Sequence, residues 1–175
     1  MVFQQQLKIL ISCDEIAKAV SRLAREIERD YQDRQPLLIG VLKGSFMFMA
    51  DLIRQLDLPL DLDFVRLSSY DAARESSGKV GVVHETKTPV KDRDVLVVED
   101  IVDTGITVSF LLDYLKSKQP ASLKVCTLTD KPSRRRIQVP IDYRGFTVSN
   151  KFIVGYGLDC DQKFRNLPDI HTLED

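Results

Sequence analysis

The sequence predicts an α/β fold, a parallel sheet with helices on both of its faces. Apolar runs short enough to be strands alternate along the chain with longer stretches whose apolar residues recur at helical spacing. Two of the short runs, Leu37–Leu42 and Val95–Val98, are continuously apolar, which is typical of strands buried on both faces. Alternating strands and helices favour crossover connections, and these join parallel neighbours in one sheet.

Three helices are expected. Ser12-Cys13-Asp14-Glu15 is a capping box, in which the serine hydroxyl and the glutamate carboxylate satisfy free amides at a helix start. Apolar residues at helical spacing follow it, so this helix should run from about Cys13 to Tyr31. A second apolar stripe runs from Phe46 to Ile53. A third runs from Val108 to Leu115 and must end near Pro120.

The remaining apolar segments predict shorter strands. Leu60–Phe64 alternates strictly between apolar and polar residues, which indicates a half-exposed strand. Residues 68–79 are polar and should form a loop, and residues 130–143 should be irregular. The other expected strands are Val80–His84, Leu123–Thr129 and Phe152–Val154, the last of them before a glycine-rich polar tail.

Length and composition limit the class of protein. The chain has 175 residues, 43% of them hydrophobic, which predicts one domain over residues 1–175. The formal net charge of -1 argues against a nucleic-acid partner. The three cysteines form no CxxC pair, so a reducing cytoplasm is expected. No apolar run approaches the ~20 residues that span a bilayer, and no membrane partner is expected.

The most informative segment is residues 95–107, where an apolar strand should stop at an acidic and hydroxyl-rich loop that opens a helix. Free backbone amides and the helix dipole favour an anion at such a place. Thr104 and Thr107 add hydroxyl donors, and Gly105 allows close approach of the backbone. Because the pattern GxxxxGK[ST] is absent, one terminal phosphate is favoured over a nucleoside triphosphate.

Three acids in the same segment suggest further chemistry. Glu99 and Asp100 can accept hydrogen bonds from sugar hydroxyls, directly or through Mg²⁺. Asp103, next to the phosphate loop, could accept or return a proton on a reacting group. A helix cap alone would explain Asp103 but not the two acids at the end of a buried strand. Ligands bind at the carboxyl ends of strands in open α/β sheets, so this loop should meet Leu42–Gly44 and the stretch after Ile153.

Val97–Gly105 resembles the phosphoribosyl pyrophosphate motif of type I phosphoribosyltransferases, and its form E-D-x-x-D-T-G resembles the hypoxanthine-guanine branch. Other segments resemble the family in the same order along nearly the whole chain. They are Gly40–Ser45 (pyrophosphate loop), residues 68–70 (start of the active-site loop), Leu128–Pro132 and Lys151–Asp159 (base-binding segments) and Phe164–Pro168 (near the C-terminus).

The resemblance implies a type I phosphoribosyltransferase-like fold, a central parallel sheet flanked by helices with a small hood subdomain. It also implies an Mg²⁺-dependent purine salvage enzyme that transfers the 5-phosphoribosyl group from phosphoribosyl pyrophosphate to hypoxanthine or guanine. The products would be IMP or GMP and pyrophosphate. The resemblance also implies a homodimer or homotetramer, so self-association is expected.

The family's site residues carry over onto matching positions. Asp103 would be the acid/base group at purine N7, Glu99 and Asp100 would face the ribose diol and its Mg²⁺, and Asp159 would hold a second Mg²⁺. A cis Leu42-Lys43 peptide would present backbone groups to pyrophosphate. The other implied substrate-binding residues are Gly44, Ser69, Tyr70, Thr104, Gly105, Ile106 and Thr107 for the phosphates and their loops, Lys131, Phe152 and Ile153 for the base, and Arg165 for pyrophosphate.

Several alternatives stay open at this stage. The segment Arg134–Arg136 would most simply be a solvated loop, but it would also support a regulatory RNA-binding protein on the same scaffold. Lys131 would be an exposed turn lysine without the resemblance. As a buried donor it would favour a 6-oxo over a 6-amino purine. Ser149-Asn150 stands where many members of the resembled family have Pro-Asp, so the preference between guanine and hypoxanthine is open. A phosphoribosyltransferase for another base, such as xanthine or adenine, also stays open.

Overall fold

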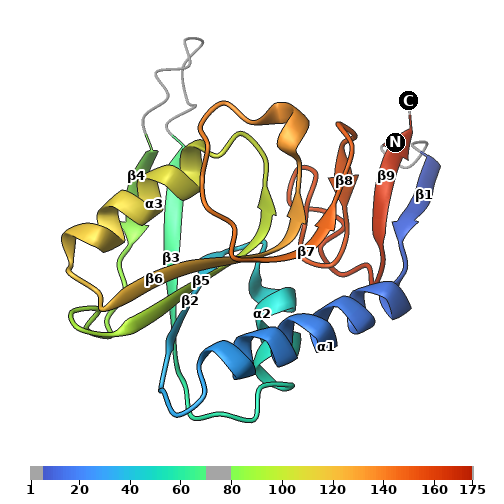
Figure 1. The fold of residues 1–175 in the computed structure, drawn as a ribbon. Helices are drawn as coiled ribbons and strands as arrows, with labels where there is room; N and C mark the ends of the chain where they lie inside the picture. Colours follow the sequence, from blue (N-terminus) through green and yellow to red (C-terminus); the bar gives the residue numbers. More distant parts are fainter. Residues whose placement is uncertain (1–5, 70–79, 175) are drawn as a thin grey trace.

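The computed structural model describes residues 6–69 and 80–174, and it contains a six-stranded sheet in the order β4-β3-β2-β5-β6-β7 (Figure 1). All neighbours in this sheet are parallel except β4, which pairs antiparallel with β3. The strands are β2 (Leu37–Leu42), β3 (Asp61–Ser69), β4 (Val80–His84), β5 (Asp94–Val102), β6 (Ser122–Asp130) and β7 (Tyr143–Thr147).

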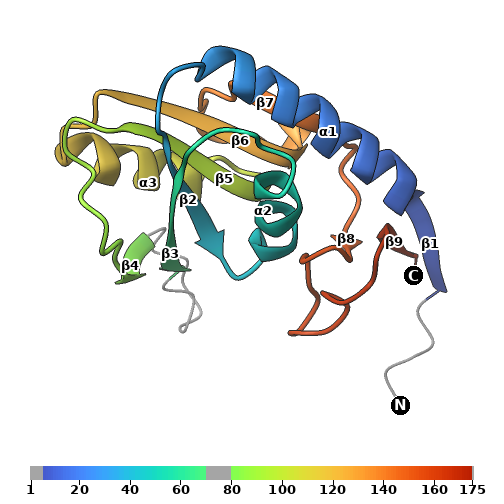
Figure 2. The same cartoon turned by 90° about the horizontal axis from the view of Figure 1, so that it is seen from below.

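Helices cover both faces of this sheet, as expected (Figure 2). Helices α1 (Cys13–Asp30) and α2 (Phe46–Ile53) pack on one face against alternate strand residues such as Leu38 and Leu96. Helix α3 (Ile106–Ser117) packs on the other face against their neighbours, such as Val95. Successive side chains of a strand point to opposite faces, so a continuous apolar run supplies both cores.

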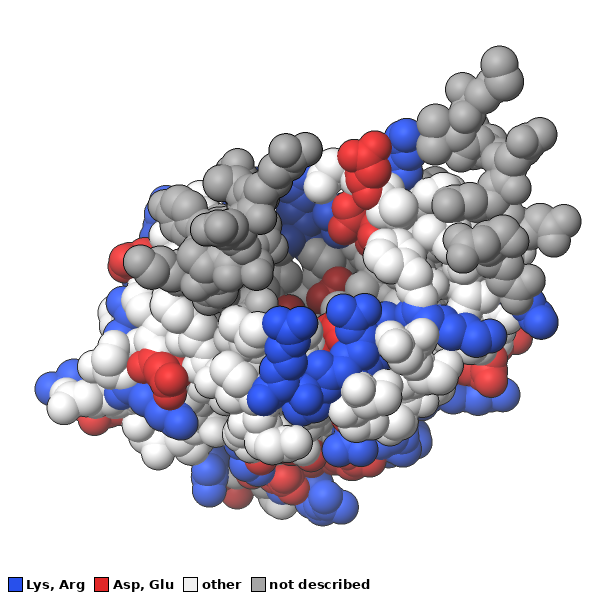
Figure 3. Space-filling model, turned by 90° about the horizontal axis from the view of Figure 1, so that it is seen from above, with Lys and Arg blue, Asp and Glu red and all other residues white. Residues whose placement is uncertain are grey.

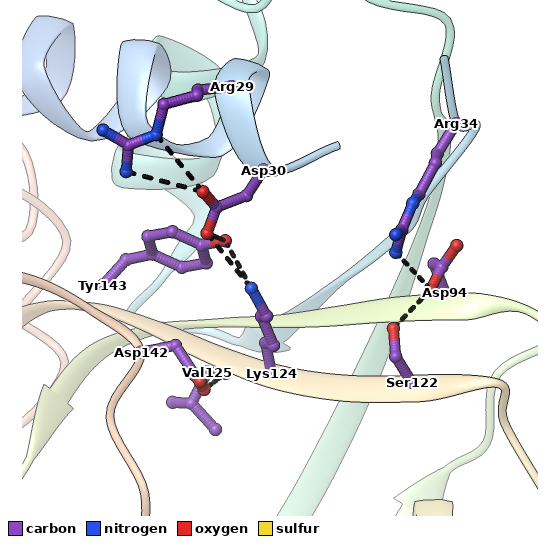
Figure 4. Close-up of polar contacts among 9 residues, drawn as sticks. All are labelled: Arg29, Asp30, Arg34, Asp94, Ser122, Lys124, Val125, Asp142 and Tyr143. Carbon is purple, nitrogen blue, oxygen red and sulfur yellow. Dashed lines mark hydrogen bonds and ion pairs between the residues drawn. The ribbon is translucent and has the colours of Figure 1, made fainter. Parts of the chain in front are cut away.

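Polar contacts at both ends of α1 fix its position. At its start both halves of the predicted capping box are present, because the Glu15 amide donates to Ser12 Oγ at 3.3 Å and Glu15 Oε2 accepts from the Ser12 amide at 2.8 Å. At its end Asp30 accepts hydrogen bonds from Tyr143 (2.8 Å) and Lys124 (3.1 Å), as Figure 4 shows. The helix is therefore anchored to β6 and β7.

The carboxyl half of β5 differs from the sequence-based prediction. The expected strand Val95–Val98 continues through Glu99 and Asp100 to Val102, so both acids are strand residues and not loop residues. The ladder with β6 causes this extension, since it runs on until Val102 lies opposite Asp130. The Thr129 hydroxyl also donates to the backbone oxygen of Asp100 at 2.8 Å.

A second, three-stranded antiparallel sheet forms the expected hood. Its order is β1 (Gln6–Ile11), β9 (Ile170–Glu174) and β8 (Ile153–Val154), so the two ends of the described chain lie side by side (Figure 1). The predicted strand at Phe152–Val154 is present as β8, but it is not the last strand, because β9 follows it; β1, β7 and β9 were not predicted. The hood strands are short, and β1 and β9 become a sheet only by pairing across almost the whole chain. In the described part of the chain no helix is long and apolar enough to span a membrane.

Candidate active site

The cis loop after β2 packs against Asp100 of β5. The Leu42-Lys43 peptide is cis, which confirms the expectation. The neighbouring Gly44 packs so closely that an added Cβ would lie 1.7 Å from Asp100 Oδ2. The expected convergence of the loops after β2 and β5 is therefore present, and only glycine leaves room for it.

Glu99 and Asp100 are buried carboxylates with acceptor capacity to spare. They are 7% and 8% exposed, and among the described residues Glu99 Oε2 has no hydrogen-bond partner. Burial raises the pKa of Glu99 well above its usual range, and the charge of Asp100 adds to the effect. Burial also raises the pKa of Asp100 to about 6. Buried oxygens of this kind suit a cation or sugar hydroxyls.

Residues 103–105 form the loop that opens α3, and Ile106 and Thr107 are the first two residues of the helix. Gly105 has φ +82°, and a Cβ there would lie 2.2 Å from the Ile137 carbonyl oxygen. The Thr104 carbonyl accepts hydrogen bonds from the amides of Arg136 (2.9 Å) and Ile137 (3.1 Å). The segment after β6 thus supports the loop from outside, and the loop with Thr107 lies at the positive end of α3.

The interpretation of Arg134–Arg136 as a solvated loop is wrong for Arg135, whereas Arg134 and Arg136 are exposed. Arg135 is almost completely buried and pairs with the equally buried Asp130, whose other oxygen lies 3.3 Å from Arg144 Nε. Arg134 Nε lies 3.1 Å from Asp103 Oδ1. A buried charge is stable only when it is paired. Asp130, the last residue of β6, is paired with Arg135 from the segment that follows the strand.

Lys131 is buried at 4% exposure, so its interpretation as an exposed turn lysine is wrong. Burial lowers its pKa, while the nearby charge of Asp103 acts to raise it. Phe152, by contrast, is 55% exposed, although Ile153 beside it is buried in β8. A buried cation beside an acid can bind a polar ring edge, and an exposed aromatic ring can stack on a flat ring.

The loop between β8 and β9 carries the third group of predicted residues. Asp159 Oδ1 lies 2.8 Å from Arg165 Nη2, and Arg165 Nη1 donates to the Gly157 carbonyl at 2.7 Å. A Cβ on Gly157 would lie 2.1 Å from the Gly44 carbonyl oxygen, so this loop packs on the cis loop. The charges of Asp159 and Arg165 both act on the pKa of Asp100, in opposite directions. All three predicted loops therefore converge.

Figure 3 views this face from above and shows acidic surface at the bottom of a central hollow, with basic side chains beside it. Within residues 6–69 and 80–174, no group of three or more His, Cys, Asp or Glu side chains is arranged to hold a metal ion by itself. Of the other predicted site residues, Ser69 ends β3 and Tyr70 lies outside the described residues.

Three charged or polar contacts were not predicted from the sequence: Arg134 with Asp103, Arg135 with Asp130, and Gln162 with Lys43. The basic run Arg134–Arg136, two residues after Asp130-Lys131, was the available signal for the first two. The third had no sequence signal, because it joins residues 119 positions apart.

The fold and the site together define an α/β protein whose buried acids and helix start meet at the carboxyl ends of its parallel strands, the usual ligand site of such sheets. The family model described as "Phosphoribosyl transferase domain" matches residues 10–161. The chain belongs to the phosphoribosyltransferase family.

Individual relatives agree over nearly the whole chain. The hypoxanthine-guanine phosphoribosyltransferase of Bacillus subtilis is 46% identical over 167 residues, which cover 95% of this chain and 93% of that protein. The bifunctional protein TilS/HprT of Listeria monocytogenes is also 46% identical, but the chain spans only about a quarter (26%) of its length. The crystal structure of a hypoxanthine-guanine phosphoribosyltransferase from Bacillus anthracis superposes with a TM-score of 0.92 at 43% identity, covering 97% of this chain and 100% of that one.

Proposed function

We propose that residues 1–175 form one catalytic unit that transfers the 5-phosphoribosyl group from phosphoribosyl pyrophosphate to hypoxanthine or guanine, a purine salvage reaction in the cytoplasm. The observation that carries the proposal is the burial of Lys131 close to Asp103. A 6-oxopurine presents its O6 and N7 along one edge. Lys131 supplies a donor for O6 and Asp103 a proton-transfer group for N7.

The sugar and its 5′-phosphate occupy the end of β5. Glu99 and Asp100 accept hydrogen bonds from the ribose diol, since they are buried and Glu99 has an unpartnered oxygen. Thr104 to Thr107 cradle the phosphate at the start of α3. Gly105 contributes by letting the segment after β6 pack closely on this loop, since a Cβ there would meet the Ile137 carbonyl oxygen.

The residues present fit an Mg²⁺ ion bound together with substrate. Glu99 and Asp100 would hold it, with substrate oxygens and water completing its shell, and Asp159 would hold a second ion. The unpartnered buried oxygen of Glu99 supports this assignment. When bound, Mg²⁺ supplies positive charge that stabilises the leaving pyrophosphate.

The chain's own cations complete the leaving-group site. Displacement of pyrophosphate from C1 of the ribose develops positive charge on the sugar and negative charge on the leaving group. Arg165 and backbone groups of Leu42–Gly44 face that negative charge. The cis peptide and the packing of Gly44 against Asp100 support this role, because the loop then lies next to an acid that we assign to the ribose.

Base preference follows from the donor and the stacking ring. A 6-amino purine would leave the buried Lys131 donor unpaired, so adenine is disfavoured. Phe152 stacks on the base with its exposed ring, and the Ile153 backbone contacts the base edge. The support for an RNA-binding role is reduced to Arg134 and Arg136, because Arg135 is buried in its ion pair with Asp130.

The test is an assay of nucleotide formation from phosphoribosyl pyrophosphate, Mg²⁺ and each of hypoxanthine, guanine, xanthine and adenine. We expect IMP or GMP and one equivalent of pyrophosphate. Formation of neither nucleotide would overturn the proposal, and faster reaction with xanthine or adenine would reassign the base. We also expect a dimer or tetramer by size-exclusion chromatography with light scattering.

A further inference from the structure

The side-chain amide of Gln162 joins two loops that carry cations. Its Oε1 accepts a hydrogen bond from Lys43 Nζ at 2.9 Å and a longer one from Arg165 Nη2 at 3.4 Å. Lys43 belongs to the cis loop after β2, whereas Arg165 belongs to the loop between β8 and β9. One neutral oxygen therefore bridges two positive side chains from distant parts of the sequence.

The backbone around Gln162 is itself held in place. Its amide donates to Asp159 Oδ2 at 2.8 Å, and its φ of +62° lies in the left-handed region. Asp161 and Phe164 share this conformation, with φ +50° and +73°. Left-handed residues other than glycine are uncommon and persist where the surroundings hold them, often at ligand sites. The loop thus directs Gln162 toward the cis loop.

A neutral bridge suits two cations that must remain available to an anion. Lys43 and Arg165 repel each other as they approach, and a shared acceptor offsets that repulsion. An acidic residue in this place would form ion pairs and cancel both charges. Asp159 already neutralises part of the Arg165 charge at 2.8 Å, so a second acid would leave little positive potential.

We propose that Gln162 is a positioning residue for pyrophosphate: it holds Lys43 and Arg165 together so that both face the leaving group before it forms. This inference rests on the function proposed above. It extends that function because the side chain of Lys43, and not only its backbone, would bind pyrophosphate.

The direct test is calorimetric titration of the full chain with inorganic pyrophosphate and Mg²⁺. Gln162→Met keeps the length of the side chain but removes the bridge, and we expect pyrophosphate to bind about fivefold more weakly, the effect of one lost hydrogen bond. Gln162→Glu should bind more weakly still. Asn166→Met, at another exposed position of the same loop, is the matched control and should bind like the wild type.

Kinetics and a double-mutant cycle separate positioning from general damage. Gln162→Met should raise KM for phosphoribosyl pyrophosphate about fivefold, with kcat and the KM for the base changed less than twofold. Combined with Lys43→Met, it should add less loss than it causes in the wild type, because only its longer contact with Arg165 remains to be removed. Thermal unfolding should match the wild type, because Gln162 is exposed.

The outcomes distinguish the two proposals. If the wild type binds pyrophosphate and Gln162→Met binds it equally well, or if the two substitutions are additive, the positioning role is wrong. If Gln162→Glu binds as tightly as the wild type, the argument for a neutral bridge is wrong. A wild type that neither binds pyrophosphate nor forms nucleotide overturns the proposed function itself.

Discussion

Arg134 Nε lies 3.1 Å from Asp103 Oδ1, so the proposed acid/base residue has a cationic partner from the segment that follows β6. Lys131, on the same segment, acts on Asp103 electrostatically as well. The carboxylate is thus placed between a half-exposed arginine and a buried lysine.

Asp103→Asn should lower kcat by about 10²- to 10⁴-fold, the usual contribution of a general acid or base. Binding of phosphoribosyl pyrophosphate should change little, because the phosphate loop and the acid pair remain. The measurement compares kcat with the dissociation constant from calorimetry. Asp113→Asn, at an exposed position of α3, is the control and should leave both unchanged. Equal losses of kcat and affinity would contradict an acid/base role.

Asp130→Asn should destabilise the protein by about 3 kcal/mol, since it leaves Arg135 buried without its charged partner. Arg134→Gln, one position away from Arg135, should cost less than about 1 kcal/mol because its ion pair is partly exposed. Urea unfolding of both variants checks the difference. Similar losses of stability in the two variants would show that burial does not determine how much each ion pair contributes.

Gly44→Ala should raise KM for phosphoribosyl pyrophosphate at least tenfold, because the added Cβ must displace either the cis loop or Asp100. Overpacking should also cost about 1–3 kcal/mol of stability. Gly145→Ala provides the comparison: its Cβ would lie 2.4 Å from the Leu128 carbonyl oxygen, between β7 and β6, and it touches neither Asp100 nor the cis loop. It should lose stability without the change in KM.

The ligand-free protein should become less stable as the pH rises from 4 to 7. Burial raises the pKa of Asp100 from 3.8 to about 6, so the folded state retains its proton where the unfolded state has lost it. That stabilisation is complete below pH 3.8 and disappears as the pH passes 6, an interval that corresponds to about 3 kcal/mol. The raised pKa of Glu99 acts in the same direction.

Urea unfolding at pH 4.5 and 7.5 with EDTA measures this dependence. Asp100→Asn should show a smaller decrease than the wild type, by up to about 3 kcal/mol. Adding Mg²⁺ and phosphoribosyl pyrophosphate should reduce the wild-type decrease, because a bound cation favours ionised carboxylates. The same pH dependence in wild type and variant would exclude Asp100 as its source.

Phe152→Ala should leave the free energy of unfolding within about 0.5 kcal/mol of the wild type, as for most exposed positions. It should raise KM for the purine about tenfold, since stacking of a base on an aromatic ring contributes ~1–3 kcal/mol. Steady-state kinetics with Phe152→Tyr as the control checks this, because tyrosine retains the stacking face. A large loss of stability without a change in KM would assign the ring to the core.

Local features of the fold were predictable from the sequence. The capping box at Ser12 and Glu15, the continuous strand Leu37–Leu42 and the stripe Phe46–Ile53 depend on residues close in the chain, and the structure reproduces their bounds. The acidic segment after Val98 predicted where the site lies for the same reason. The residues that carry the chemistry of this segment are consecutive in the chain and lie at the end of one strand.

Long-range packing decided the rest. The length of β5 depends on its ladder with β6, and the hood depends on pairing of β1 with β9. Whether Lys131 is buried, whether Arg135 meets Asp130, and whether Gln162 reaches Lys43 depend on which segments cover them. The sequence by itself therefore determined the helices, the buried strands and the kind of chemistry. Only the tertiary structure decided burial and charge pairing, because both arise from contacts between residues far apart in the chain.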